Sequence, residues 1–213
     1  MLPTPPEGYI SVIGTSYLHP ITTLLDALDS HNPKGPNDVQ SSTFENGYSA
    51  SIIVLTVLLI ESAISRTQYI MGNKTPKKPI DFVRETYPTS GFPDKLEELF
   101  VTRDAIVHNH LWEAQIYWDE TLGMKLVDAE LKDGYGDKKF TKVLNSTTRT
   151  TRILNINLFP TRICQADCIT VLKNAIEFLL YLEQIDRNYI YLSPQYVKYK
   201  GVPVSFVDIV KGL

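Results

Sequence analysis

The sequence predicts a mainly α-helical protein that carries a small antiparallel β insertion before its last long helix. Apolar residues recur at helical spacing over several long segments. Residues 113–159 interrupt this pattern with short alternating runs and turn residues, which favour strands. Hydrophobic residues make up 43% and charged residues 21% of the 213-residue chain, a composition that can bury a core. We therefore expect a single domain, 1–213, with the 113–159 insertion inside it.

The first third of the chain predicts a short helix and a long one. A brief apolar run at residues 9–13 is expected to form an edge strand. Apolar residues between positions 21 and 28 share one helical face, and a helix that begins near Pro20 must end before the turn residues 32–37. Residues 43–71 predict a long helix whose middle is apolar all round, so we expect it at the centre of the fold.

Two further helical segments precede the insertion. Residues 81–87 predict one or two helical turns that Pro88 ends. Asp94 is expected to cap the next helix, because Glu97 follows three residues later as in a capping box. That helix is expected to run through Leu111.

The insertion is expected to consist of short antiparallel strands. We predict strands at residues 115–118, 125–131 and 140–144, with turn residues 133–137 joining the last two as a hairpin. The alternating residues 152–159 predict one more strand.

Helix is expected to return after the insertion. We expect a helix that begins near Thr161 and runs to about Arg187, with apolar residues at helical spacing between positions 169 and 182. The tail, residues 189–213, contains a strand-like Tyr-Ile-Tyr-Leu run and ends in a last helical turn.

Charge and composition exclude several classes of protein. The net charge of −3 and the isoelectric point of about 5.8 exclude a wholly basic nucleic-acid coat. Two cysteines cannot form a disulfide framework, and free thiols suit a reducing cytosol. Residues 1–8 lack the features of a secretory signal, and the uncharged run 47–60 is shorter than the roughly 18–20 apolar residues of a membrane span. We expect a cytoplasmic protein that has no membrane partner.

The segment Arg103–His110 carries the most chemical information. On a helix, Arg103 shares the apolar stripe of Leu99 and Ile106, where arginine is rare unless it is paired. A guanidinium offers forked donors to phosphate oxygens, and an imidazole can act as general acid or base near neutral pH. The alternative is structural, with Arg103 paired to Glu61 of the long helix and the histidine placed for the helix dipole.

The motif Arg-Asp-x-x-x-His, at Arg103, Asp104 and His108, resembles the Arg-polar-x-x-x-His signature of HEPN domains. HEPN domains are bundles of four or five helices with the signature on the third core helix. A short and a long helix precede the motif here and one long helix follows it, so the resemblance covers about residues 21–187 without the insertion. It implies a HEPN-like helical bundle.

The resemblance also implies an activity. Catalytic HEPN proteins are metal-independent endoribonucleases that dimerise, so that two motifs converge on one cleft. By position, Arg103 would bind the phosphate, Asp104 would be the polar residue after it, and His108 would be the catalytic histidine. The family accepts four to six intervening residues, so His110 also satisfies the spacing as the second choice. Glu61 is the candidate that would orient Arg103.

The implied reaction needs no cofactor and no metal. The ribose 2′-OH would attack the adjacent phosphate and leave 2′,3′-cyclic phosphate and 5′-OH ends. The implied role is that of a toxin or an antiviral, abortive-infection effector, whose partners are RNA, a second copy and an inhibitory antitoxin or defence protein. The alternative is a non-catalytic HEPN-like interaction or ligand-sensing module.

Basic residues concentrate in the second half of the insertion and just after it. Six lie between positions 138 and 162, where the sequence has no acidic residue: Lys138, Lys139, Lys142, Arg149, Arg152 and Arg162. They could contact an RNA backbone, or they could form a solvated face or bind an acidic partner.

A zinc site is the weaker interpretation of Cys164 and Cys168. They are four residues apart, which is no standard zinc-finger spacing, and the chain has no third cysteine to join the His108–His110 segment. Buried free thiols are the expected state.

Overall fold

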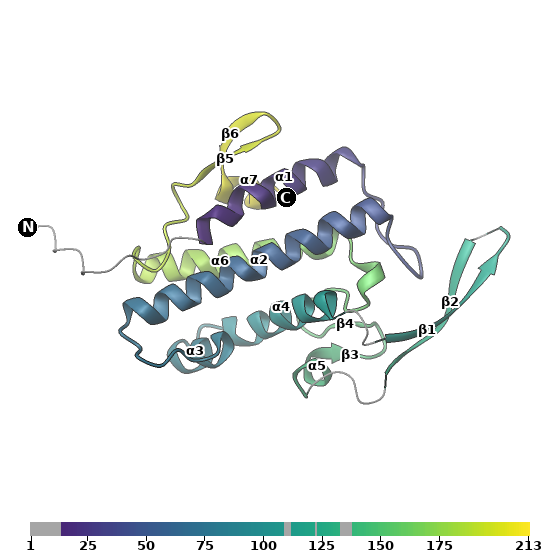
Figure 1. The fold of residues 1–213 in the computed structure, drawn as a ribbon, viewed down its shortest axis with the longest axis horizontal. Coiled ribbons are helices and arrows are strands. Elements are labelled where there is room, and N and C mark those ends of the chain that lie inside the picture. The colour runs from purple at the N-terminus through teal and green to yellow at the C-terminus, as the bar shows by residue number, and fades with distance from the viewer. Residues whose placement is uncertain (1–13, 109–111, 122, 133–137) are drawn as a thin grey trace, which may run out of the picture.

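Four helices, α1, α2, α4 and α6, pack together and form the body of the molecule (Figure 1). The computed structural model describes residues 14–108, 112–121, 123–132 and 138–213. In chain order the described elements are η1 Gly14–Tyr17, α1 Leu18–Ser30, α2 Thr43–Ile70, α3 Pro79–Thr86, α4 Phe92–Val107, β1 Trp112–Asp119, β2 Gly123–Leu131, α5 Lys138–Val143, β3 Leu144–Asn145, β4 Thr150–Thr151, η2 Pro160–Arg162, α6 Gln165–Ile185, β5 Tyr196–Tyr199, β6 Val202–Ser205 and α7 Phe206–Gly212. The prediction of a mainly helical protein with small antiparallel sheets is confirmed. The strand expected at 9–13 lies outside the described residues.

Helix α2 is the central helix, as its apolar middle predicts. The Ser42 hydroxyl caps its first turn by accepting the N–H of Glu45, and Gly72 follows its end with a φ of 74°. It contacts α1, α3, α4 and α6. By length and mean hydropathy alone α2 could cross a membrane, but half of its most apolar window is buried inside this fold. The prediction of a buried core helix is thereby confirmed.

Helix α6 packs along α2 and begins later than its apolar pattern suggested. Residues 160–162 form a separate 3₁₀ turn, and α6 starts after Cys164. The Asp167 side chain accepts the N–H of Cys164, and the Cys164 side chain contacts the N–H of Asp167, so a capping box sets the start.

The predicted N-cap at Asp94 is wrong. Gly91, with a φ of 73°, turns the chain, and α4 begins at Phe92 with Pro93 in its first turn. The hydroxyl of Ser90 accepts the N–H of Phe92. Asp94 therefore lies inside the helix, where its carboxylate accepts a hydrogen bond from Arg84 instead of capping a helix end. The other end also differs, because α4 ends at Val107 rather than continuing through Leu111.

The insertion opens with a hairpin whose strands differ from the predicted pairing. Strand β2 pairs with β1, antiparallel, and with no other strand in the described part of the chain. The predicted turn residues, 133–137, lie outside the described residues. Residues 138–143 form α5, so the strand predicted at 140–144 is wrong: Phe140 and Val143 are buried three residues apart, at helical spacing.

The strand predicted at 152–159 is also wrong. The two-residue strands β3 and β4 pair with each other, and beyond β4 only an isolated bridge joins Asn157 to Thr150. Asn155 takes a left-handed conformation with a φ of 55°, and the N–H groups of Ile153 and Leu154 donate to the carboxylate of Glu98. A helix side chain therefore takes the place that a neighbouring strand would have filled.

The tail returns across the helical body as a hairpin and a short helix. The predicted strand at 189–192 is wrong, because the N–H of Leu192 donates to the buried carboxylate of Glu183 in a loop. Strands β5 and β6 follow instead, joined by Lys200 and Gly201, which both have positive φ as a tight hairpin turn requires. Helix α7 confirms the predicted last turn.

Two apolar clusters of unequal size result. The main core joins α1, α2, α3, α4, α6, α7 and the tail. A smaller cluster lies on the other side of α4 and contains Val101, Ala105, Phe140, Val143, Leu144 and Leu158. Trp112 and Leu131, at the base of the hairpin, pack against it. The second half of α4 is thus held between the helical core and the insertion.

Candidate functional site

Arg103 lies one turn before the end of α4 and is bound by α2. Its Nη1 and Nη2 donate to the two carboxylate oxygens of Glu61, each over 3.2 Å. This forked arrangement is the geometry in which arginine holds a carboxylate most specifically. The side chains of Arg103 and Glu61 keep 19% and 29% exposure, so the pair lies at the surface end of the α2–α4 contact. The predicted contact between Glu61 and Arg103 is confirmed.

The guanidinium of Arg103 retains donors for a ligand. Its Nε donates to Asp104 over 2.6 Å, so three of its five N–H groups are engaged and two are left. Burial lowers the pKa of Arg103, but the hydrogen bond to Glu61 and the negative charges of Asp104 and Glu61 outweigh it and raise the pKa above its usual value. The group is therefore a permanent, oriented cation.

His108 caps the C-terminal end of α4. Its backbone N–H donates to the carbonyl of Asp104 over 2.8 Å, and the residue is exposed. The carbonyl end of a helix is a favourable place for a positively charged group. His108 thus lies on the same exposed helix end as Arg103. The second-choice histidine, His110, lies outside the described residues.

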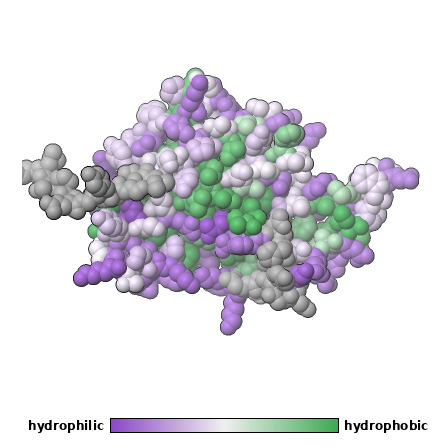
Figure 2. Space-filling model, in the orientation of Figure 1, coloured by the Kyte–Doolittle hydropathy of each residue, from purple (hydrophilic) through white to green (hydrophobic). Residues whose placement is uncertain are grey.

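An open apolar face of α2 adjoins the Arg103–Glu61 pair. Val54, Leu55 and Leu58 are half-buried and follow one another at helical spacing toward Glu61. Figure 2 shows hydrophobic side chains gathered over α2 at the centre of this face, with a hydrophilic band beside them. We call Val54, Leu55 and Leu58 the α2 open face. Partly exposed apolar side chains therefore lie beside a charged pair on this side of α2.

The six basic residues between positions 138 and 162 have different surroundings. Lys142 donates to Glu97, and Arg149 lies 3.7 Å from Asp128 while its Nε donates to the carbonyl of Ala129. Arg162 is half-buried. The remaining three, Lys138, Lys139 and Arg152, are exposed. Lys142 and Arg149 therefore help to hold the insertion in place.

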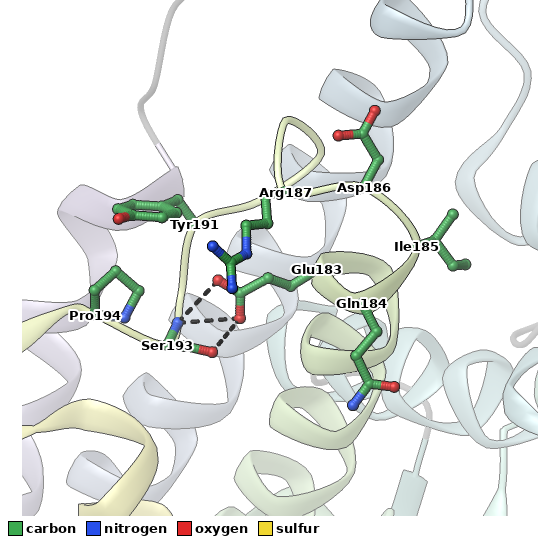
Figure 3. Close-up of a pocket in the computed structure, with 8 residues that line it drawn as sticks. All are labelled: Glu183, Gln184, Ile185, Asp186, Arg187, Tyr191, Ser193 and Pro194. Carbon is green, nitrogen blue, oxygen red and sulfur yellow. Dashed lines mark hydrogen bonds between the residues drawn. The ribbon is translucent and has the colours of Figure 1, made fainter.

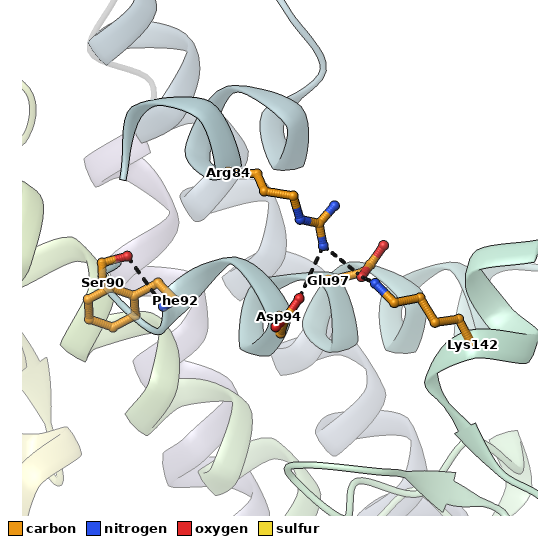
Figure 4. Close-up of polar contacts among 6 residues, drawn as sticks. All are labelled: Arg84, Ser90, Phe92, Asp94, Glu97 and Lys142. Carbon is orange, nitrogen blue, oxygen red and sulfur yellow. Dashed lines mark hydrogen bonds and ion pairs between the residues drawn. The ribbon is translucent and has the colours of Figure 1, made fainter. Parts of the chain in front are cut away.

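Glu97 is the centre of that attachment. Its buried carboxylate accepts hydrogen bonds from Arg84 of α3, over 2.9 Å, and from Lys142 of α5, over 2.6 Å (Figure 4). Burial raises the pKa of Glu97, but the hydrogen bonds from Lys142 and Arg84 outweigh it and hold the pKa below its usual value. One carboxylate thus joins α3, α4 and the insertion.

An open hollow of about 670 Å³ lies at the C-terminal end of α6 (Figure 3). Neither Arg103 nor Glu61 lines it. The carboxylate of Glu183 points into it but accepts the N–H groups of Leu192 and Ser193 and the hydroxyl of Ser193. Arg187 and Tyr191 lie at the exposed rim. Because its buried carboxylate is committed to the loop, the hollow has a structural acid rather than a reactive one.

The two cysteines are buried free thiols, as expected. Burial raises the pKa of the Cys164 thiol to about 11 and that of Cys168 to about 12. Both thiols are therefore protonated at neutral pH and poor nucleophiles. Within the described residues no group of three or more His, Cys, Asp or Glu side chains could hold a metal.

Sequence reasoning missed the buried acids that organise the loops. Glu98 binds the N–H groups of Ile153 and Leu154, and Glu45 binds those of Gly35 and Gln165. Their only sequence signal is an acidic residue on a face that turns out to be buried. The sequence does not indicate which loop N–H groups donate hydrogen bonds to these carboxylates.

Comparison of the chain with protein-family models, curated proteins and solved structures finds no match.

Proposed function

We propose that this protein is a metal-independent endoribonuclease of the HEPN type. One observation carries the proposal: Arg103 is held in a fork by Glu61 at the exposed end of α4, with two N–H groups left to bind and with His108 capping the same helix. An oriented guanidinium and an exposed imidazole at the end of one helix supply the two groups that phosphodiester cleavage needs. The HEPN resemblance of the same residues supports this assignment.

In the proposed reaction the ribose 2′-OH attacks the adjacent phosphorus in line, and the bond from phosphorus to the 5′ oxygen breaks. Arg103 donates its remaining N–H groups to the non-bridging oxygens and stabilises the charge that grows on them. His108 accepts the proton of the 2′-OH or returns one to the leaving 5′ oxygen. The products are a 2′,3′-cyclic phosphate and a 5′-OH end. Glu61 is a positioning residue, since it acts through Arg103.

The active form in this proposal is a cytoplasmic homodimer. Two copies would bring two Arg103–His108 motifs to one cleft, and each histidine could then serve a different proton transfer. The α2 open face, which borders the Arg103–Glu61 pair, supports a contact at this place. Lys138, Lys139 and Arg152 offer exposed charge for an RNA backbone. A toxin or abortive-infection effector of this kind would be held inactive by an antitoxin or defence partner.

The test is RNA cleavage in EDTA with the product ends mapped. The wild type and the exposed-histidine control His19→Ala should cut RNA and leave cyclic phosphate ends, and they should leave DNA intact. His108→Ala and Arg103→Ala should lower the rate by about 100-fold or more. If His108→Ala keeps full activity and His110→Ala loses it, the motif is right and the choice of histidine is wrong. Equal activity in all variants contradicts the proposal.

One observation favours a second function. Arg103 already contacts two carboxylates, those of Glu61 and Asp104, so its positive charge is more than balanced and the three side chains together carry a formal charge of −1. A non-catalytic HEPN-like module that binds a protein through the α2 open face would use the pair only as structure. In that case no RNA is cut, and Arg103→Ala changes binding or folding alone.

A further inference from the structure

A small cavity lies beside the second half of α2, next to the loop that follows α6. Its volume is about 50 Å³. Three separate segments of the chain line it, with the residues Gly14, Thr15, Leu59, Ser62, Ala63, Arg66, Tyr189, Ile190 and Tyr191. Neither Arg103 nor Glu61 belongs to this lining, and none of its described residues is acidic. Arg66 therefore supplies the one charged side chain among the described residues of the lining.

The guanidinium of Arg66 is held by the same loop that forms one wall of the cavity. Its Nε donates to the backbone carbonyl of Asn188 over 2.7 Å, and the next three residues in the chain are lining residues. Asp186 fixes this loop in turn. Its side chain accepts the N–H of Asn188 over 2.8 Å, and its backbone carbonyl accepts the N–H of Tyr189 over 2.9 Å. The guanidinium therefore has a defined orientation before any ligand binds.

One nitrogen of this guanidinium is buried without a hydrogen-bond partner. Nη1 of Arg66 is inaccessible to solvent, and no described residue accepts its N–H groups. Arg66 also forms no ion pair with a carboxylate of the described residues. Buried donors in folded proteins are nearly always paired, and an unpaired charged donor is the most costly kind. Arg66 thus offers a buried cationic donor to an acceptor that the described residues do not supply.

The lining sets the charge and the size of that acceptor. One guanidinium balances one negative charge, so a buried dianion such as phosphate would keep a charge unpaired. A planar carboxylate carries a single charge and accepts hydrogen bonds from guanidinium N–H groups in good geometry. Leu59, Ala63 and Ile190 add aliphatic walls. A volume of about 50 Å³ has room for roughly three to five water-sized groups, which is the size of a short organic acid.

We propose that this cavity binds a small free carboxylic acid in its ionised form. The carboxylate accepts from Nη1 of Arg66, and the short aliphatic part of the acid packs against Leu59, Ala63 and Ile190. The hydroxyl of Ser62, on the turn of α2 before Arg66, is a second donor in the lining. The site goes beyond the proposed ribonuclease, because no residue of the lining belongs to the Arg103–His108 motif.

The test is a titration followed by NMR at the backbone amides of residues 189–191. The wild type is titrated at constant ionic strength with propionate, with its neutral counterpart propionamide and with inorganic phosphate. Arg66→Gln removes the charge, whereas Ser62→Leu fills the cavity and keeps Arg66. Arg187→Gln is the matched control, because Arg187 lines the neighbouring open hollow, which shares Tyr191 with the cavity (Figure 3).

Propionate should shift these signals saturably, with the same Kd in the wild type and in Arg187→Gln. The Kd should be higher by about 10-fold or more for propionamide, and for propionate in Arg66→Gln, since a charge-assisted hydrogen bond is lost. Ser62→Leu should abolish binding, and it decides the question if Arg66→Gln does not fold.

Three results overturn the inference: no saturable shift in the wild type, equal Kd values for propionate and propionamide, or unchanged propionate binding in the folded variants at Arg66 and Ser62. Phosphate that binds more tightly than propionate also overturns it, because the ligand would then not be a carboxylate. None of these readouts depends on RNA cleavage, so the ribonuclease proposal and this site can fail separately.

Discussion

The helical body and the insertion use apolar residues in different ways. The body buries long runs from several helices in one continuous core, and α2 alone places Ile52, Ile53 and Ile60 there at full burial. The insertion buries a few residues against the outer side of α4 and leaves Trp118 and Ile116 largely exposed. The body is therefore stabilised by its large buried apolar area, whereas the insertion depends more on particular polar contacts with α4.

Helix α4 serves both regions. Val101 and Ala105 face the insertion, Leu99 faces the main core, and Arg103 faces α2. The proposed site therefore lies where a rigid core meets a less extensively packed attachment. A reaction that needs a fixed guanidinium benefits from the well-packed helical core beside Arg103. A docked partner can contact the insertion on the other side of α4.

The largest expected effect comes from truncating one phenylalanine in each region. Phe178→Ala in the main core should lower the free energy of unfolding by about 3–5 kcal/mol, since the side chain is fully buried among several helices. Phe140→Ala in the small cluster should cost less globally and should mainly increase hydrogen exchange of the insertion amides. Denaturant unfolding and hydrogen exchange measure the two. Equal global losses would contradict the division into two regions.

A smaller effect is expected from the buried acid that holds the insertion. Glu98→Ala leaves the N–H groups of Ile153 and Leu154 without their acceptor and should cost about 2–3 kcal/mol. Glu98→Gln keeps one acceptor oxygen and should cost less. Hydrogen exchange at residues 150–158 should rise in Glu98→Ala with little change in α6. A uniform loss of protection across both regions would show that Glu98 supports the core instead.

The helices could be predicted from the sequence because their information is local. The apolar spacing within α2 and within α6 is enough to predict a buried helix, whichever elements the helix packs against. The contact of Glu61 with Arg103 was also predictable, since an arginine on an apolar stripe needs an acid and α2 offers one.

The insertion could not be predicted to the same extent because its information is not local. Residues 152–159 alternate like a strand, yet the N–H groups of Ile153 and Leu154 donate to the carboxylate of Glu98, which is distant in the sequence. The pairing of β1 with β2 depends on a bulge that alternation alone does not reveal. Likewise, the sequence around Asp94 is typical of an N-cap, but the chain turns at Gly91 and the helix begins before Asp94.

The smallest expected effect concerns pH. The pKa of Glu97 is held below its usual value in the folded protein, so its ion pairs stabilise the fold above that usual value and are lost as the pH falls through the lowered one. Stability should therefore decrease below about pH 4.5, by roughly 1 kcal/mol or less from this group, since Lys142 and Arg84 are partly exposed. Thermal unfolding from pH 7 to 3 measures it. Glu97→Gln should flatten this part of the profile, and an unchanged profile would contradict the assignment.

One experiment separates the structural role of Arg103 from its chemical role. RNA cleavage and the free energy of unfolding are measured on the same preparations of the wild type, Arg103→Lys and Glu61→Gln. Because the pair is partly exposed, each substitution should cost about 1 kcal/mol or less in stability. Cleavage should fall by about 100-fold in Arg103→Lys, which loses the fork, and by less in Glu61→Gln. Folded variants that all cleave RNA equally, or an Arg103→Lys variant that unfolds, would contradict a catalytic role for Arg103.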